Sequence, residues 1–178
     1  MFLIIDQWPQ SKFQSKFEKI LSSGSSILNL FRQPEVKDST IITQTLTSGL
    51  RETGAKFLYN DFSGLDAVID TLVVFDDLRC LRWAIEQKQK GLVKRLLAGP
   101  FITKLPSDSR TLLLTAPIDG FIFLNRDRRD QFVRMSPTLP RASYVWSQGV
   151  DKFLEILEGE QPPTPPARVL RATNNASV

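Results

Sequence analysis

One continuous apolar run, ended by two acids and followed by a helical stripe, is the strongest pattern in the chain. Residues 72–75 are all apolar, which is typical of a parallel strand covered on both faces. Asp76 and Asp77 end this run, and apolar positions over 78–85 then recur at the spacing of an amphipathic helix. A second apolar run follows at 96–98. The pattern predicts a strand, helix, strand unit whose two strands are parallel and adjacent.

The same two patterns recur on both sides of this unit. Short apolar runs predict further strands, and amphipathic stripes predict further helices. The predicted strands are 2–5, 27–31, 56–59, 121–124 and 144–146, the predicted helices are 13–21, 42–50, 126–136 and 153–157, and 112–114 are buried in an unassigned form. This alternation predicts an α/β fold, a doubly wound, mostly parallel sheet in a Rossmann-like three-layer single domain. We expect the domain to span 1–158, with 159–178 as a Pro-rich linker or disordered tail.

The ends of the predicted strands carry the first candidate site residues, because open α/β sheets bind ligands along their carboxyl edge. Asp76 and Asp77 are candidates for a general base, although such a pair at a strand end more often caps the next helix and supplies its first-turn acid, the reading we favour. Arg32 follows the predicted strand 27–31, where it could hold a phosphate or carboxylate or form a surface salt bridge.

Two further positions stand out because they oppose local helix preferences. Arg126 and its neighbours Arg128 and Arg129 fall at the start of a helix capped by Asn125, where positive charge opposes the helix dipole. This placement indicates an anionic partner. Gly49 lies inside a helical stripe, which predicts close helix packing or a nearby ligand, and packing is favoured.

Charge and composition narrow the function classes. The net charge is +4, and residues 76–141 carry the excess, with 13 Lys/Arg against 7 Asp/Glu. We favour solvated helix faces over a nucleic-acid surface, because acids alternate with the bases and aromatic residues are not interleaved. With no histidine and one cysteine, Cys80, the chain excludes an internal disulfide, a Cys/His zinc cluster and an imidazole-based triad.

Targeting and cofactor motifs are absent from the sequence. No apolar run approaches the ~20 residues of a membrane-spanning helix, so we expect a cytoplasmic protein and leave peripheral membrane contact open. The sequence has no GxGxxG after a strand and no GxxxxGK[ST], so we expect neither a dinucleotide nor a triphosphate. We therefore expect no cofactor and no metal.

Three segments taken together resemble a known family. They are SGLRETGAKFLYN at 48–60, AIEQKQKGLVKRLLAGPFITKLPSD at 84–108, and IDGFIFLNRDRRDQF at 118–132 continuing to PTLPRASYVWSQGVD at 137–151. Their order resembles the amino-terminal half of a group 1, GT-B type glycosyltransferase, in which a glycine-proline loop, a strand with a polar end and a Gly-Val-Asp turn follow one another. The resemblance covers roughly 26–155.

The resemblance implies a division of labour between two Rossmann-like domains that face each other across a cleft. The amino-terminal domain mostly holds the acceptor, and the carboxyl-terminal domain holds the nucleotide sugar. We therefore expect hexosyl transfer to an acceptor hydroxyl only with a C-terminal donor domain or partner protein, and inactivity alone. The expected acceptor is a sugar or an anionic molecule. The acceptor-cleft candidates are Arg32, Asp76, Asp77, Gly99, Pro100, Asn125 and Arg126, with catalytic residues unassigned.

Departures from the family pattern keep a second interpretation open. Phe101 replaces the asparagine that often follows Gly99-Pro100, and Asn125 with Arg126 stands where a serine is common. Fewer polar groups are then available to contact an acceptor. The alternative is a non-catalytic Rossmann-like interaction module derived from such an enzyme. A basic nucleic-acid-binding domain is the least favoured of the three classes, because it requires the charge of 76–141 to form one surface.

Overall fold

The computed structural model describes residues 1–9, 38–63, 65–101, 113, 115–135 and 142–160. Strands and helices alternate through most of this part of the chain. The elements are β1 (Phe2–Ile5), α2 (Asp38–Glu52), β2 (Phe57–Tyr59), β3 (Ile69–Val74), α3 (Leu78–Gln89), β4 (Val93–Ala98), β5 (Gly120–Phe123), α5 (Arg126–Met135), β6 (Ala142–Val145) and α6 (Val150–Glu158). The predictions for 13–21, 27–31, Arg32 and the tail beyond residue 160 lie outside the described residues.

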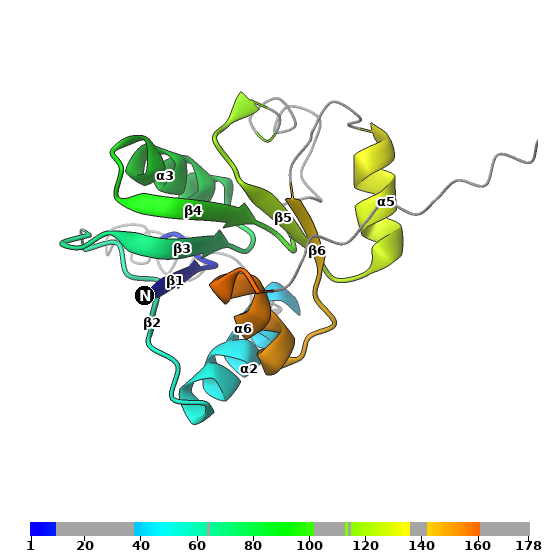
Figure 1. Ribbon diagram of the computed structural model, residues 1–178, viewed down its shortest axis with the longest axis horizontal. Coiled ribbons are helices and arrows are strands. Elements are labelled where there is room, and N and C mark those ends of the chain that lie inside the picture. The colour runs from blue at the N-terminus through cyan, green and yellow to red at the C-terminus, as the bar shows by residue number, and fades with distance from the viewer. Residues whose placement is uncertain (10–37, 64, 102–112, 114, 136–141, 161–178) are drawn as a thin grey trace, which may run out of the picture.

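All six described strands form one parallel sheet in the order β2-β1-β3-β4-β5-β6 (Figure 1). The two strands on which the sequence interpretation depends are adjacent, since Leu72 pairs with Leu96 and Val74 with Ala98. The prediction of an α/β, Rossmann-like sheet is confirmed, and the described sheet is parallel throughout rather than mostly so. After β1 the chain moves to one side of the sheet to make β2, and β3 starts the progression to the other side. The direction of winding therefore switches between β1 and β3.

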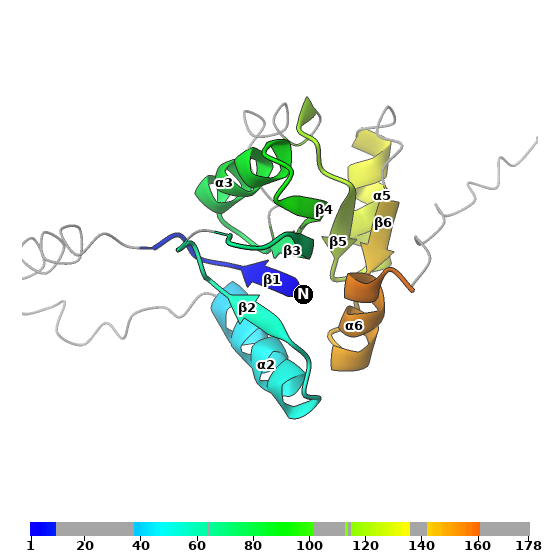
Figure 2. The ribbon, with the colours of Figure 1, turned by 60° about the vertical axis from the view of Figure 1, so that its left-hand side comes forward.

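Helices cover both faces of the sheet, which explains why its strands read as unbroken apolar runs. Helices α3 and α5 pack on one face, and α2 and α6 lie together on the opposite face (Figures 1 and 2). The larger aromatic residues of the second face, Phe75, Trp146 and Phe153, form one buried group with ring centroids 5.0–6.0 Å apart. The two apolar layers hold the sheet between them and thereby position its carboxyl edge.

Two strands begin earlier than their apolar runs, because polar side chains at their amino ends form hydrogen bonds with α6. Thr71 in β3 donates a hydrogen bond to the Leu157 carbonyl, and Arg95 in β4 donates one to the Ile156 carbonyl (2.9 and 2.7 Å). Both acceptors belong to the last turn of α6, whose carbonyls lack partners within the helix. The polar side chains thus complete α6 instead of facing water.

The described residues of the connection from β2 to β3 form no helix. Phe62 from this connection packs edge-on between Trp8 and Trp83, with centroids 5.2 and 5.0 Å apart. Through this contact Trp83, which is partly buried, packs against the core of the α3 face. None of the helices described here is both long and apolar enough to cross a membrane.

Candidate functional site

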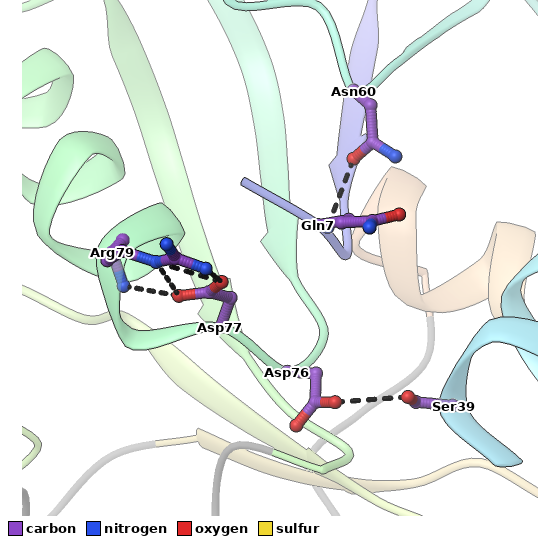
Figure 3. A network of polar contacts seen from close by, with 6 residues as sticks. All are labelled: Gln7, Ser39, Asn60, Asp76, Asp77 and Arg79. Carbon is purple, nitrogen blue, oxygen red and sulfur yellow. Dashed lines mark hydrogen bonds and ion pairs between the residues drawn. The ribbon is translucent and has the colours of Figure 1, made fainter. Parts of the chain in front are cut away.

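The carboxyl ends of β1 and β3 meet where the winding of the sheet reverses. Open α/β sheets leave a crevice at such a switch point, and ligands bind there. Asp6 and Gln7 follow β1, while Asp76 and Asp77 follow β3. Asn60, which follows β2, reaches the same place because its side chain amide contacts the end of β1 (Figure 3). Three carboxylates therefore lie close together at this point.

Asp6 is buried and fully hydrogen-bonded. It is 8% exposed, and its two oxygens accept hydrogen bonds from the Asn60 amide (2.6 Å) and the Tyr59 hydroxyl (2.9 Å). The Asn60 Oδ1 in turn accepts the Asp6 backbone N–H at 2.9 Å. Burial, together with the Asp6 carboxylate, raises the pKa of Tyr59 well above its ordinary value, so this hydroxyl stays a donor. The network joins β1 to β2, and each carboxylate oxygen of Asp6 has a hydrogen-bond donor within it.

Asp77 is the N-cap of α3, as the favoured sequence reading expected. Its Oδ1 accepts the Arg79 backbone N–H at 2.8 Å, and its Oδ2 accepts the Arg79 guanidinium at 2.6 Å. Burial alone would raise the pKa of Asp77, but the hydrogen bonds from Arg79 and the Trp8 backbone N–H lower it by more. Both of its oxygens are therefore occupied in stabilising the start of α3.

Asp76 is not part of this cap, which corrects the reading of the pair as cap and first-turn acid. Its side chain points to the opposite face, where its Oδ2 accepts a hydrogen bond from Ser39 Oγ at 3.0 Å (Figure 3). Adjacent residues at a strand end point to opposite faces, which explains why the two acids separate. Asp76 is half-buried, and no residue that the structure describes contacts its Oδ1.

The loop after β4 also ends at the carboxyl edge, as predicted, but Gly99 and Pro100 are buried there. Gly99 has φ +129°, and a Cβ at this position would lie 2.1 Å from the Ile122 carbonyl oxygen of β5. Its glycine is therefore required for two strands to pack closely. Gly99 and Pro100 shape the floor of the edge and present no polar side chain to a ligand.

Asn125 and Arg126 lie two strands away from β3, about 10 Å along the edge. Asn125 caps α5, since its Oδ1 accepts the Arg128 backbone N–H at 2.9 Å, and this prediction is confirmed. Arg126 is exposed in the first turn of α5, and its guanidinium has no partner within the described ranges. Arg129 is instead buried, with its Nε 2.7 Å from Asp130.

Among the described residues, acids outnumber bases at the switch point. Asp6, Asp76 and Asp77 lie there with one described cation, Arg79, which is already paired with Asp77. The described ranges contain no group of three or more acidic, cysteine or histidine side chains that could hold a metal ion. The described side chains can accept hydrogen bonds from a ligand, and none of them offers an anion an unpaired charged donor.

A groove of about 610 Å³ lies at the opposite, amino edge of the sheet, and Arg95, Asp70 and the amino terminus in its lining are already paired. Arg95 contacts the end of α6 and the Tyr144 hydroxyl (2.9 Å). Asp70 binds Lys94 and the amino terminus, and these hydrogen bonds lower its pKa to about 2. These groups serve structural contacts, and the candidate site is instead the switch point, where open α/β sheets bind their ligands.

Sequence reasoning missed Asp6, Ser39 and Asn60 as members of this site. A signal existed for Asp6, because it ends the apolar run 2–5 as Asp76 ends 72–75, and neighbouring parallel strands share an edge. Ser39 lies just before the predicted helix 42–50, and no local pattern links it to Asp76, 37 positions along the chain.

Comparisons with known proteins give no assignment for this site. No protein family, curated protein or solved structure matches the chain significantly.

Proposed function

We propose that this chain is the acceptor-binding domain of a GT-B type glycosyltransferase, acting with a separate donor domain. The observation that carries the proposal is Asp76, a half-exposed carboxylate at the switch point of the parallel sheet, one oxygen of which has no hydrogen-bond partner among the described residues. An ionised carboxylate in this position can orient an acceptor hydroxyl and accept its proton. The residues that carry the family resemblance, Gly99-Pro100, Asn125 and Gly149-Val150, all follow strands along the same edge.

Acceptor binding alone is not transfer, and the division of labour assigns the nucleotide sugar to another domain. Chemistry would then require a donor domain to close over the carboxyl edge, excluding water and aligning the two reactants. The donor domain would also supply the cations that neutralise the departing diphosphate, because the switch point itself is negatively charged. The isolated chain should therefore bind an acceptor and transfer nothing.

A complementation experiment tests the proposal. The chain is mixed with, or fused to, donor domains of group 1 glycosyltransferases, and transfer of radiolabelled hexose from nucleotide sugars to glycoside acceptors is measured. We expect no transfer by the chain alone, transfer by at least one pair, and its loss in Asp76→Ala. Glu86→Ala, which removes an exposed acid of α3, is the matched control and should keep activity. Transfer by the chain alone, or by no pair, would refute the proposal.

A specific observation favours the alternative, a non-catalytic interaction module. The Gly149-Val150-Asp151 turn resembles the start of an interdomain linker, yet here it begins α6, which buries Phe153 and Ile156 in the core. This helix returns the chain to the amino edge, away from the candidate site. Failure of every donor-domain pair, with intact folding of the chain, is the result that this alternative expects.

A further inference from the structure

Ser39 has no role as a helix cap that would explain its burial. It is 7% exposed, and its hydroxyl donates to Asp76 rather than to the backbone of its own helix. A buried hydroxyl needs a hydrogen-bond partner, and this one spans from the first turn of α2 to the end of β3. Its effect is to fix the plane of a carboxylate that has no other described partner.

Elimination among the three carboxylates makes Asp76 the one available to a ligand. Both oxygens of Asp6 accept hydrogen bonds from Tyr59 and Asn60, and both oxygens of Asp77 accept them from Arg79. Only Asp76 retains an oxygen, Oδ1, without a partner among the described residues. Because Ser39 holds Oδ2, the free Oδ1 is presented in one direction.

We infer that Ser39 is a positioning residue, which orients Asp76 to bind a hydroxyl of an uncharged sugar acceptor. This inference rests on the proposed function and narrows its substrate class. An ionised carboxylate only accepts hydrogen bonds, so its ligand must be a donor such as a sugar hydroxyl. Among the described residues, the charged side chains at this point are Asp6, Asp76, Asp77 and Arg79, and this excess of acids over bases disfavours a phosphate or carboxylate. Of the two acceptor classes expected from the sequence, a sugar and an anionic molecule, this inference therefore selects the sugar.

The test is a binding titration of the chain itself, which needs no donor domain. Methyl glycosides of glucose, mannose, galactose and N-acetylglucosamine are titrated into ¹⁵N-labelled chain, with glucose 6-phosphate and inorganic phosphate as anionic probes. We expect at least one neutral glycoside to shift the amides of Ser39, Asp76 and Asp77 saturably, and inorganic phosphate to leave them unmoved. Glucose 6-phosphate should bind more weakly than the matching neutral glycoside.

Variants separate positioning from folding. Asp76→Ala should weaken binding by about 10- to 100-fold, the loss expected for a hydrogen bond to a charged group. Ser39→Ala should weaken it by about 3- to 10-fold, and Ser39→Thr, which keeps the hydroxyl, should restore most of it. Thr43→Val is the matched control, because it removes a buried hydroxyl that bonds only the Ser39 carbonyl (2.7 Å) in the same helix. Melting temperatures are compared for all four.

The outcomes are distinct. Binding by no neutral glycoside, tighter binding of either anionic probe at these amides, or equal effects of Ser39→Ala and Thr43→Val would overturn the inference. Glycoside binding that depends on Ser39 and Asp76, with no transfer by any donor-domain pair, would support the inference while refuting the catalytic proposal.

Discussion

At the scale of single residues, the partners of a side chain decide its role more than its chemical type does. Asp6, Asp76 and Asp77 are the same residue at the same sheet edge. Asp6 closes a buried network with Tyr59 and Asn60, and Asp77 starts a helix. The Oδ1 of the remaining acid, Asp76, has no hydrogen-bond partner among the described residues. Asp77 takes the contacts with Arg79 on the other face of the sheet, so Arg79 does not reach Asp76. A site is therefore created by what the surrounding hydrogen bonds leave unsatisfied.

Asn60 illustrates how backbone shape contributes to this outcome. Its φ of +50° is in the left-handed region, which asparagine tolerates better than most residues. In this conformation its Oδ1 reaches the backbone N–H groups of Asp6 and Gln7 (2.9 and 3.4 Å). The amide side chain thus extends the β1–β2 pairing beyond the last strand residue and satisfies Asp6 at the same time.

The N-cap of α3 predicts a specific pH dependence of stability. Because the pKa of Asp77 is lowered in the folded state, its charge stabilises the fold above about pH 4 and ceases to do so as the pH falls through the lowered value. Asp77→Ala should lower the free energy of unfolding at pH 7 by about 1–2 kcal/mol. Asp77→Asn keeps the cap and loses only the ion pair with Arg79, which should cost under about 1 kcal/mol.

Urea unfolding at pH 7 and pH 3 provides the measurement. The difference between the unmodified chain and Asp77→Asn should shrink at pH 3, because below its ordinary pKa of about 3.9 the carboxyl group takes up a proton on unfolding. Asp127→Asn is the control, since Asp127 is an exposed acid in the first turn of α5 and its side chain contacts no described residue. A difference between the unmodified chain and Asp77→Asn that is the same at both pH values would contradict the role given to the charge.

At the scale of elements, α2 and α6 approach each other closely because one position has no side chain. A Cβ on Gly49 would lie 2.5 Å from Val150 Cγ2, which is shorter than any normal contact. The expectation that Gly49 marks close helix packing is therefore confirmed. Glycine costs up to about 1 kcal/mol in helix propensity at this position, and the close packing of α2 against α6 offsets that cost.

The contact between Gly49 and Val150 predicts that Gly49→Ala lowers the free energy of unfolding when Val150 is present and raises it when Val150 is replaced by alanine. Gly49→Ala should destabilise the chain by about 1–2 kcal/mol, since overpacking outweighs the gain in helix propensity. In a Val150→Ala background the clash is absent, and the same substitution should stabilise by up to about 1 kcal/mol. A double-mutant cycle by urea unfolding measures the coupling. Additive effects of the two substitutions would show that the helices do not meet at this pair.

The strands and helices were largely predictable because each carries its own pattern. The run at 72–75 and the first three residues of the run at 121–124 are buried, and Gly54 and Gly91, which follow helices, have the positive φ that helix ends favour. The bond between Ser39 and Asp76 was not predictable, because it depends on how far α2 lies from β3 after folding. Local patterns specify elements, whereas the site arises from their packing.

At the scale of the whole molecule, α6 connects the two ends of the sheet. It starts after β6 at the carboxyl edge and ends against Thr71 and Arg95 near the amino edge. Its apolar side packs into the same core as α2 and the strands. The described helices pack on the two faces of the sheet rather than across its carboxyl edge, where the proposed partner, a donor domain or another protein, would meet the chain.

A single buried thiol makes the cooperativity of this architecture measurable. Cys80 is the only cysteine. It lies on the buried side of α3 and belongs to the core that this helix forms with β1, β3, β4 and β5. Burial, and secondarily the charge of Asp77, raises the pKa of the Cys80 thiol to about 12. At pH 8 the thiolate fraction would then be about a thousandfold lower than in an unfolded chain, before access is considered.

We expect a thiol reagent such as DTNB to label the native chain only when the core opens. The labelling rate should therefore rise with urea in parallel with the equilibrium unfolding curve, and Asp77→Ala should accelerate labelling at fixed urea in proportion to its loss of stability. Cys80→Ala supplies the unlabelled baseline. Rapid labelling in the absence of urea would mean that α3 separates from the sheet without global unfolding, and the sheet edge that holds Asp76 and Asp77 would then lack the rigidity on which the proposed acceptor site depends.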